Sequence, residues 1–449
     1  MKLRALPQSR VHFFAAFVLL CCCTSERIAP LPEKPQKAAI HSGHHVPRMP
    51  PPRQEHALQP QDLLIPDSCT LAESVHLDRA QVTQDIQLLL YAMNEAYGGR
   101  KYVSQAAFVA AMKQLRELPL KLPQNSSLVS SFNSSSLGML ESIDEILYAI
   151  PDNHLQPRSP RSGLSQYRLA RQRKGSVGGN IWQQADSCWG VTEKSVSVPG
   201  GEKKIAVLSL TSFPAPEDQR WTGFKNQIEK IIKEESIFII DLRGNAGGSD
   251  VMAAWLASRL LGRTVVSPFE VVVRSTTPES LALSANNWKL KIIWNRLEKK
   301  PNPPYFEARL LEKMRVFEQS MGHSKEAPNG EERIQMAYQT GLSDQPRYPG
   351  RVILLTDALC ASSCESLVEF FQELPNAITV GENTAGSVHF ADVGILLLPN
   401  SQLMVQIPTD FWRYKDGRYL ERVGYPPKIN VAKGKNAMDT ALRLAGQFF

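Results

Sequence analysis

The chain has 449 residues, of which 43% are hydrophobic and 21% are charged, and its formal net charge is +7 at pH 7. This composition is typical of a globular protein, and the length is too great for one ordinary core, so two to three structural units are expected. Lys2, Arg4 and Arg10 supply part of the charge near the N-terminus. The remaining excess is spread thinly, which argues against a nucleic-acid partner.

The N-terminus has the pattern of an export signal. Basic residues precede an apolar stretch over residues 11–20, which is too short to cross a bilayer as a mature helix. Leu20 and Cys23 have the spacing of a bacterial lipobox, so we predict a lipoprotein-type signal over residues 1–23 with lipidation at Cys23. Lipidation at Cys22 and simple secretion are the alternatives. The expected location is the bacterial cell envelope, as a periplasmic protein or outer membrane lipoprotein, or outside the cell.

A linker and a helical unit are expected next. Residues 24–68 are rich in proline, lysine, glutamine and histidine, which predicts a disordered tether. Residues 69–160 are predicted to form a small helical N-terminal subdomain, because apolar residues recur at helical spacing. Its helices are expected over residues 82–95, 103–118 and 137–150. The sequence Pro-Asp-Asn-His, ending at His154, follows the last of them.

Residues 165–449 are predicted to form an α/β core with strands that are at least partly parallel. Strands are expected over residues 175–187, 188–198, 204–210 and 236–242, and helices over residues 221–234 and 249–261. An insertion over residues 265–343 is expected to cap this core. It includes two charged helical stretches, over residues 288–300 and 305–322.

Residues 351–365 have the pattern of a strand, a tight turn of small residues and the start of a helix. Ser362 and Ser363 lie at this junction, where the free amides of a helix start point at whatever the hydroxyl attacks. The alternative is that these serines only cap the helix. Further strands are expected over residues 377–380, 394–398 and 402–409. A short glycine loop over residues 243–248 offers a second set of exposed amides, for an oxyanion or for tight packing.

A serine nucleophile needs a base, and few histidines are available. Four lie in the predicted globular part: His76, His154, His323 and His389. Residues 381–393 contain no lysine, so a serine–lysine pair is excluded there. The residues alone leave His154 and His389 open. Cys360 and Cys364 flank Ser362 at a spacing that permits contact but does not establish a disulfide.

Four motifs in order resemble the tail-specific, or C-terminal processing, serine peptidases. They are DLRGNAGG (residues 241–248), VILLTDALCASSCESLVEFFQ (352–372), GENTAGS (381–387) and YLERVGYPP (419–427). The similarity is greater to the branch that includes the tricorn protease core and the interphotoreceptor retinoid-binding modules. The resemblance implies an α/β fold of the crotonase-like β-spiral type with a small helical N-terminal subdomain. The spacing between His154 and residue 204 leaves no room for a PDZ domain.

The resemblance also implies site residues. Ser362 matches the nucleophile, His154 the base and Glu421 a glutamate that holds the network. The Ser363 amide and the turn at Gly247 and Gly248 match the oxyanion donors.

Other positions near this set have open roles. Ser387 stands where processing members carry a catalytic lysine, and the role of Asn153 is open. Ser387 and His389 are candidates either for an alternative catalytic role or for the loop that contacts the substrate. Asp392 is a candidate for an alternative catalytic acid.

The expected function is therefore an exported serine endopeptidase acting on peptides or unfolded proteins, without a cofactor or metal. Two alternatives use the same scaffold: a ligand-binding protein without proteolytic activity, and an esterase or amidase. A lipid on Cys23 would be the expected contact with a membrane.

Overall fold

A computed structural model gives the structure of the protein. It describes residues 57–69, 71, 76–121, 128–129, 138–158, 188–274, 276–321, 331–332, 338, 340–342, 344–432 and 435–449. The predicted signal and the predicted strand over residues 175–187 lie outside the described residues.

The first sheet has the strand order β13-β10-β9-β6-β5-β4. Its strands are β4 (Trp189–Val198), β5 (Gly201–Leu210), β6 (Ile237–Asp241), β9 (Arg351–Thr356), β10 (Ala377–Gly381) and β13 (Ile429–Asn430). All neighbours pair in parallel except β4 and β5, which form an antiparallel hairpin. The predicted α/β layering with parallel strands is confirmed.

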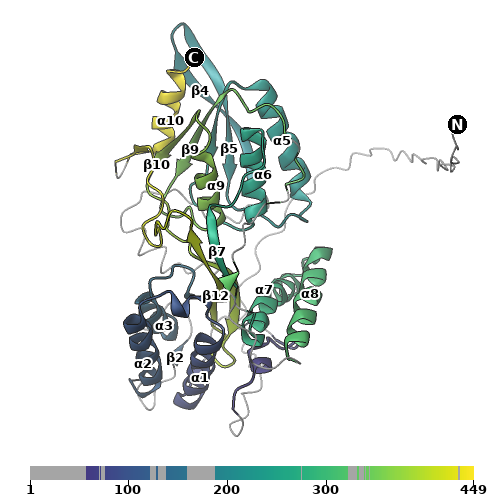
Figure 1. The fold of residues 1–449 in the computed structure, drawn as a ribbon, viewed down its shortest axis with the longest axis vertical. Coiled ribbons are helices and arrows are strands. Elements are labelled where there is room, and N and C mark those ends of the chain that lie inside the picture. Colours follow the sequence, from purple (N-terminus) through teal and green to yellow (C-terminus); the bar gives the residue numbers. More distant parts are fainter. Residues whose placement is uncertain are drawn as a thin grey trace, which may run out of the picture. The chain divides into compact units, whose positions relative to one another are not determined.

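Helices cover both faces of this sheet, as Figure 1 shows. They are α5 (Arg220–Glu234), α6 (Asp250–Leu261) and α9 (Ser363–Phe371) on one face, and α10 (Ala437–Gly446) on the other. Successive residues of β6 alternate between the faces: Phe238 and Ile240 pack under α5, α6 and α9, whereas Ile237 and Ile239 pack under α10. This two-sided burial explains why β6 is a continuous apolar run.

The second sheet is antiparallel. Its order is β11 (Phe390–Leu397), β12 (Met404–Tyr414), β7 (Phe269–Arg274) and β8 (Glu331–Glu332), and β3 (Gln156–Arg158) also pairs with β12. The start of β12 pairs with β3, and its end pairs with β7. The strand β3 begins two residues after His154, so its pairing with β12 attaches the histidine turn to this sheet.

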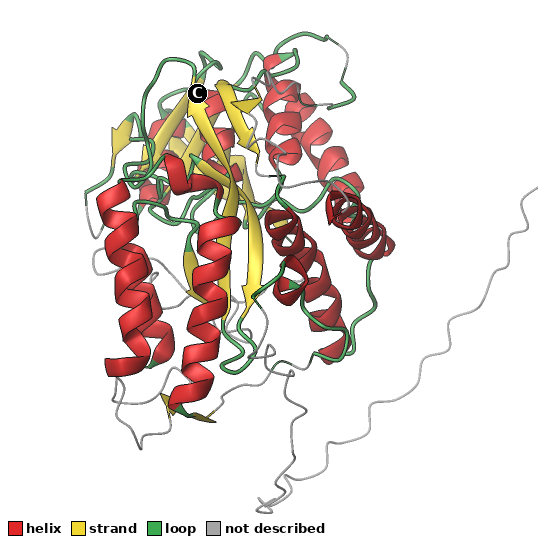
Figure 2. Ribbon diagram, turned by 60° about the horizontal axis from the view of Figure 1, so that its bottom comes forward, coloured by secondary structure: helices red, strands yellow, loops and turns green. Residues whose placement is uncertain are grey.

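Helical elements pack on both faces of the second sheet (Figure 2). One cluster joins it to α1 (Arg79–Glu95), α2 (Gln105–Lys121) and α3 (Met139–Tyr148). The other cluster joins it to α7 (Pro278–Leu297), which pairs with α8 (Pro304–Met321). The shorter elements of this half are η1 (Pro60–Leu63), β1 (His76–Leu77), η2 (Gly98–Lys101) and β2 (Leu128–Val129).

Two expectations need correction. The prediction of disorder does not hold for residues 57–68, because Leu63 and Ile65 are buried and the Ile65 amide donates to Asn286 Oδ1 at 2.9 Å. The predicted insertion is also not wholly an addition to the core, since it includes β7, which pairs with β12. Within the described residues, no helix is long and apolar enough to span a membrane.

Candidate active site

The turn between β9 and α9 holds Ser362 in an unusual backbone conformation. Its φ of 57° and ψ of −123° lie in a region that residues other than glycine rarely adopt. Such a conformation costs on the order of 1–3 kcal/mol and persists only where the surroundings hold it. It presents the serine at the start of α9, at the carboxyl end of a parallel strand, which is the arrangement of a nucleophile elbow.

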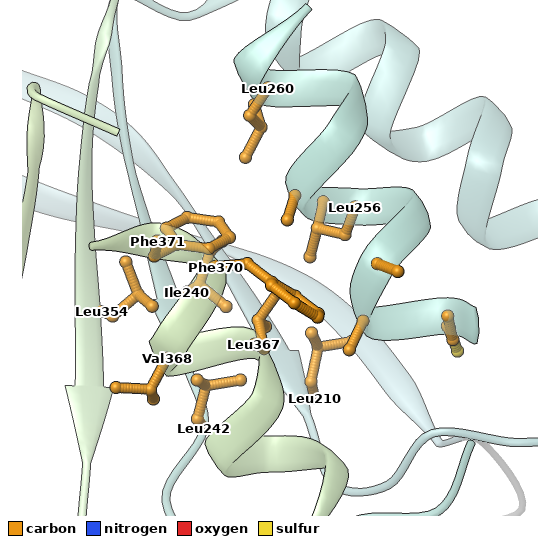
Figure 3. Packing of buried hydrophobic residues seen from close by; sticks show 14 of the residues in the cluster. Leu210, Ile240, Leu242, Leu256, Leu260, Leu354, Leu367, Val368, Phe370 and Phe371 are labelled. Atoms are coloured by element: carbon orange, nitrogen blue, oxygen red, sulfur yellow. The ribbon is translucent and has the colours of Figure 1, made fainter. Parts of the chain in front are cut away.

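The helix α9 is anchored by its apolar face. Leu367, Phe370 and Phe371 recur at helical spacing and are almost fully buried, and Figure 3 shows them between the sheet and α6. Burial of an aliphatic or aromatic side chain of this size stabilises the fold by about 1.5–3 kcal/mol. This packing therefore fixes the helix whose N-cap is Ser362.

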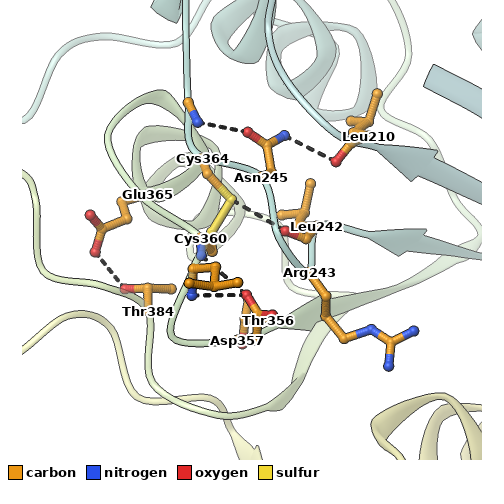
Figure 4. Close-up of a disulfide and its surroundings, with 12 residues drawn as sticks. Leu210, Leu242, Arg243, Asn245, Thr356, Asp357, Cys360, Cys364, Glu365 and Thr384 are labelled. Atoms are coloured by element: carbon orange, nitrogen blue, oxygen red, sulfur yellow. Dashed lines mark hydrogen bonds between the residues drawn. A yellow bond between two sulfur atoms is a disulfide. The ribbon is translucent and has the colours of Figure 1, made fainter. Parts of the chain in front are cut away.

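A disulfide joins Cys360 to Cys364 around Ser362, with a Cα–Cα distance of 5.3 Å (Figure 4). Both cysteines are fully buried. The bridge ties the turn before the serine to the first turn of α9. It therefore limits the backbone movements open to the residues between.

Below the serine, the Glu365 carboxylate is a buried acceptor. It accepts hydrogen bonds from the Ser362 amide at 3.2 Å, the Gly386 amide at 2.8 Å and the Ser387 amide at 2.7 Å, and from the Thr384 hydroxyl. Burial raises the pKa of Glu365 to about 7, although these hydrogen bonds oppose the shift. The carboxylate thus connects the serine turn to the loop between β10 and β11.

The glycine loop approaches the elbow from β6. Gly247 has a φ of 96°, and a Cβ atom there would lie 2.7 Å from the Ala361 carbonyl oxygen, so only glycine fits without strain. Its amide donates to Asn245 Oδ1 at 2.8 Å. The amides of Gly248 and Ser363 have no hydrogen-bond partner among the described residues. Of the three expected oxyanion donors, these two amides are the ones left available.

His154 is held through its backbone. Its amide donates to Asp152 Oδ1 at 2.8 Å, and the Leu155 amide donates to the same atom at 3.1 Å. The imidazole Nδ1 is buried without a hydrogen-bond partner in the described part of the chain. Burial, with a smaller contribution from Arg158, lowers the pKa of His154 to about 4. The ring is therefore neutral at pH 7, as a proton acceptor must be.

Glu421 also acts on backbone amides. Its Oε1 accepts from the Asn153 amide at 2.8 Å, and its Oε2 accepts from the amides of Val388 at 3.2 Å and His389 at 3.1 Å. Burial, and then the nearby Asp152, raise the pKa of Glu421 well above its usual range. The carboxylate reaches the residue before His154, and none of its hydrogen bonds in the described residues is to the imidazole.

The side chain of Asn153 completes this junction. Its Nδ2 donates to the Ala385 carbonyl at 2.9 Å and to the Gly386 carbonyl at 3.0 Å. Glu365 accepts from the Gly386 amide, so one peptide segment is held by Asn153 on one side and by Glu365 on the other. The serine turn and the histidine turn are therefore linked through the loop over residues 382–388.

His389 uses both ring nitrogens in hydrogen bonds to backbone. Its Nδ1 lies 2.8 Å from the Trp412 carbonyl, and its Nε2 accepts from the Leu420 amide at 3.0 Å. These partners fix the tautomer with the proton on Nδ1. The ring is fully buried and stacks on Tyr419. Its lone pair is thus occupied, unlike Nδ1 of His154.

A cavity of about 840 Å³ collects most of the candidate residues. Its lining includes Ser362, Ser363, Gly248, His154 and Ser387. The lining also includes Asp392. In the described residues, no group of three or more His, Cys, Asp or Glu side chains is placed to hold a metal ion.

Sequence reasoning gave no role to Glu365. It stands three residues after Ser362, the spacing of a capping box, and that signal was available. Its contacts with residues 384, 386 and 387 depend on the path of a distant loop. No local pattern predicts such contacts.

Comparison with known proteins gives one family. The model of peptidase family S41 matches residues 204–431, about half of the chain. No curated protein sequence matches the chain.

Solved structures share the fold at low sequence identity. Mature CPAF complexed with lactacystin is 13% identical, with a TM-score of 0.50, covering 82% of this chain and 98% of that one. Mature CPAF alone is 15% identical, with a TM-score of 0.50, covering 82% and 95%. A weaker match is the photosystem II D1 C-terminal processing protease, 13% identical, with a TM-score of 0.37, covering 81% and 97%.

Proposed function

Because the chain belongs to peptidase family S41 and is a serine peptidase, we propose that it is an exported endopeptidase that acts through Ser362, His154 and Glu421. The family membership confirms the resemblance to tail-specific serine peptidases and implies peptide or protein substrates. The observation that carries the proposal is the strained Ser362, which shares one cavity with His154 and with the free amides of Gly248 and Ser363.

In the proposed reaction, Ser362 Oγ attacks the carbonyl carbon of the scissile peptide bond. His154 takes the hydroxyl proton and gives it to the leaving amine, which departs as the acyl-enzyme forms. Water, deprotonated by the same imidazole, then hydrolyses the ester and restores the serine. A positioned general base of this kind contributes about 10²- to 10⁴-fold to the rate.

The amides of Gly248 and Ser363 would stabilise the oxyanion of each tetrahedral intermediate. Both residues line the cavity, and neither amide has to break another hydrogen bond in the described residues to bind the oxyanion. Loss of one such donor typically costs about 10²- to 10³-fold in kcat. Gly247 would serve instead to let the two turns approach, because its own amide is bound to Asn245.

We assign Glu421 and Glu365 as positioning residues rather than groups that touch the substrate. Glu421 holds the Asn153 amide, next to the base, and Glu365 holds the Ser362 amide, at the nucleophile. Each also holds amides of residues 386–389, so the two carboxylates fix serine and histidine relative to one loop.

The finer features of the fold and the location are part of the same proposal. The core is expected to be a crotonase-like β-spiral. Export and a lipid on Cys23 are expected from the N-terminal sequence, which lies outside the described residues. Metabolic labelling with an alkyne fatty acid should mark the wild-type protein and not Cys23→Ser. Equal labelling of both would rule out this lipidation site.

The test of the nucleophile is covalent labelling of the full chain by a fluorophosphonate probe, together with cleavage of casein. We expect both in the wild type and in Ser284→Ala, which removes another serine of the same cavity, and neither in Ser362→Ala. Equal labelling of wild type and Ser362→Ala would remove the proposed nucleophile. Labelling and ester hydrolysis without peptide cleavage would indicate an esterase instead.

The test of the base compares His154→Ala with His389→Gln, after thermal melts have established that both variants fold. We expect labelling to be lost in the first variant and retained in the second. The reverse result would assign the base to His389.

A further inference from the structure

The cavity beside Ser362 has two walls of different origin. One wall carries Ser362 and Gly248 of the core together with His154, which lies between α3 and β3. The other comes from the helical pair α7 and α8. Its lining members include Trp288 and Lys291 of α7, and Tyr305, Phe306, Arg309 and Lys313 of α8. A peptide bound at the serine would therefore lie against these helices.

Two lysines of this wall have no acidic partner in the described residues. Lys291 and Lys313 make no ion pair there, whereas Arg309 on the same wall is paired with Glu217 at 2.6 Å and Glu312 at 3.1 Å. Lys289, just outside the cavity lining, is likewise paired, with Asp67 at 2.8 Å. Of these four basic side chains on α7 and α8, the two without an ion pair in the described residues are the lysines that line the cavity.

The ammonium of Lys291 lies over aromatic rings. Its Nζ is 4.1 Å from the ring centre of Trp288 and 6.0 Å from that of Phe306. Lys291 is exposed to solvent, and desolvation by the protein packed beside it lowers its pKa to about 8. No carboxylate is near enough to oppose the shift. The ammonium is largely charged at pH 7 and lacks a counter-ion.

Two acidic side chains of the cavity lining, Glu217 and Asp218, are already paired with arginines. Glu217 is paired with Arg309, and Asp218 with Arg220 at 2.7 Å. On the core wall, Asp250 accepts from the hydroxyls of Ser363 and Ser366. The charge of the two lysines is therefore available to a ligand.

The aromatic side chains provide an apolar surface beside these charges. Trp288, Tyr305 and Phe306 contact one another edge to face, with ring centres 4.8 to 6.2 Å apart. They are half-buried, so one side of each remains open to the cavity. Methylene groups of a glutamate side chain can pack on such rings while the carboxylate meets an ammonium.

We propose that the wall formed by Lys291, Lys313 and Trp288 selects peptide substrates that carry acidic side chains near the scissile bond. This inference rests on the proposed function, because it assumes that the peptide is cleaved at Ser362. It adds a substrate class, namely peptides with glutamate or aspartate within a few residues of the cleaved bond.

The test uses quenched fluorescent peptides of one sequence that differ by Glu, Gln or Lys at single positions on either side of the scissile bond. At the most responsive position, we expect the wild-type kcat/KM for the Glu peptide to exceed that for the Gln peptide by roughly tenfold. In the double variant Lys291→Gln, Lys313→Gln this ratio should fall to about one. Arg315→Gln, an exposed change on α8 outside the cavity, should keep the wild-type ratio.

Two results would overturn the proposal: a ratio near one at every position in the wild type, or a preference that survives in the folded double variant. If no peptide is cleaved, the proposed function fails separately. The wall is then tested by fluorescence anisotropy of the same peptides on Ser362→Ala. Tighter binding of Glu than Gln peptides, lost with the two lysines, would support the proposal, and equal binding would refute it.

Discussion

The imidazole of His154 is buried in a neutral state, which has a measurable consequence for stability. In the unfolded chain this histidine titrates near pH 6.5, whereas burial lowers its folded pKa to about 4. Between these values the unfolded chain binds a proton that the folded protein does not. Acidification therefore destabilises the fold through this residue.

We predict that His154→Asn removes this penalty. Relative to the variant, the wild type should lose roughly 3 kcal/mol of unfolding free energy between pH 7 and pH 4. Urea unfolding at several pH values measures this difference. A difference between the two proteins that stays constant with pH would show that His154 is not held neutral.

Glu365 has a different pH window, because its pKa is raised to about 7. Its four partners are all donors, so a protonated carboxyl has to release one of them. We predict that kcat/KM falls as the pH drops through about 7, as the loop loses an anchor. The Glu365→Gln variant should be less active, and its kcat/KM should not fall as the pH drops through about 7. If the variant shows the same fall as the wild type, a group other than Glu365 is responsible for it.

At the level of single residues, sequence reasoning could name candidate roles but not hydrogen-bond partners. Ser362 and His154 were singled out by local turns and by a family resemblance. That Glu421 accepts from the amides of residues 153, 388 and 389 depends on how three distant segments meet. Nothing in the sequence around Glu421 indicates those partners.

At the scale of elements, the elbow is held by a disulfide and by the packing of α9. The bridge between Cys360 and Cys364 closes a very short loop, for which chain entropy predicts only about 2 kcal/mol of stabilisation. An effect on catalysis is also expected, because the bridge spans the strained Ser362.

We predict that the double variant Cys360→Ala, Cys364→Ala loses about 2 kcal/mol of stability and about tenfold in kcat, with KM little changed. Urea unfolding and steady-state kinetics measure these separately. The matched control is Cys188→Ala, a buried free cysteine. A wild-type kcat in the double variant would contradict the prediction, because it would show that the disulfide is not needed to position Ser362.

Element positions were predictable where the pattern is local. The runs that became β5, β6 and β9 were apparent from apolar content alone. The helix α7 begins at Pro278, ten residues before the expected start, although Thr277 as N-cap and a proline in the first turn are recognisable start signals. The membership of β7 in the second sheet could not be predicted, because it depends on pairing with β12, far along the chain.

At the scale of the whole molecule, the site lies where two sheets are joined. The proposed nucleophile, Ser362, follows β9 of the first sheet, and the proposed base, His154, precedes β3 of the second. Their relative position therefore depends on contacts between segments rather than on either sheet alone. Asn153 makes such a contact, through its two hydrogen bonds to the carbonyls of Ala385 and Gly386.

We predict that Asn153→Ala lowers kcat by roughly ten- to a hundredfold while changing the melting temperature little. The reason is that Asn153 contributes more to the position of His154 relative to Ser362 than to the stability of the fold. Asn153→Asp should be at least as impaired, since a carboxylate offers no donor and faces two carbonyl oxygens. Kinetics and thermal melts of both variants provide the measurement. Near-normal kcat in Asn153→Asp would contradict a positioning role.

The order of these parts along the chain has a consequence for synthesis. Of the three proposed site residues, His154 leaves the ribosome first, Ser362 much later and Glu421 last. A nascent chain thus carries the proposed base and nucleophile before the Glu421 carboxylate, which holds the histidine turn, is present. We expect hydrolytic capacity to appear only after Glu421 has been synthesised, so a shorter nascent chain would be protected from digesting itself or its neighbours.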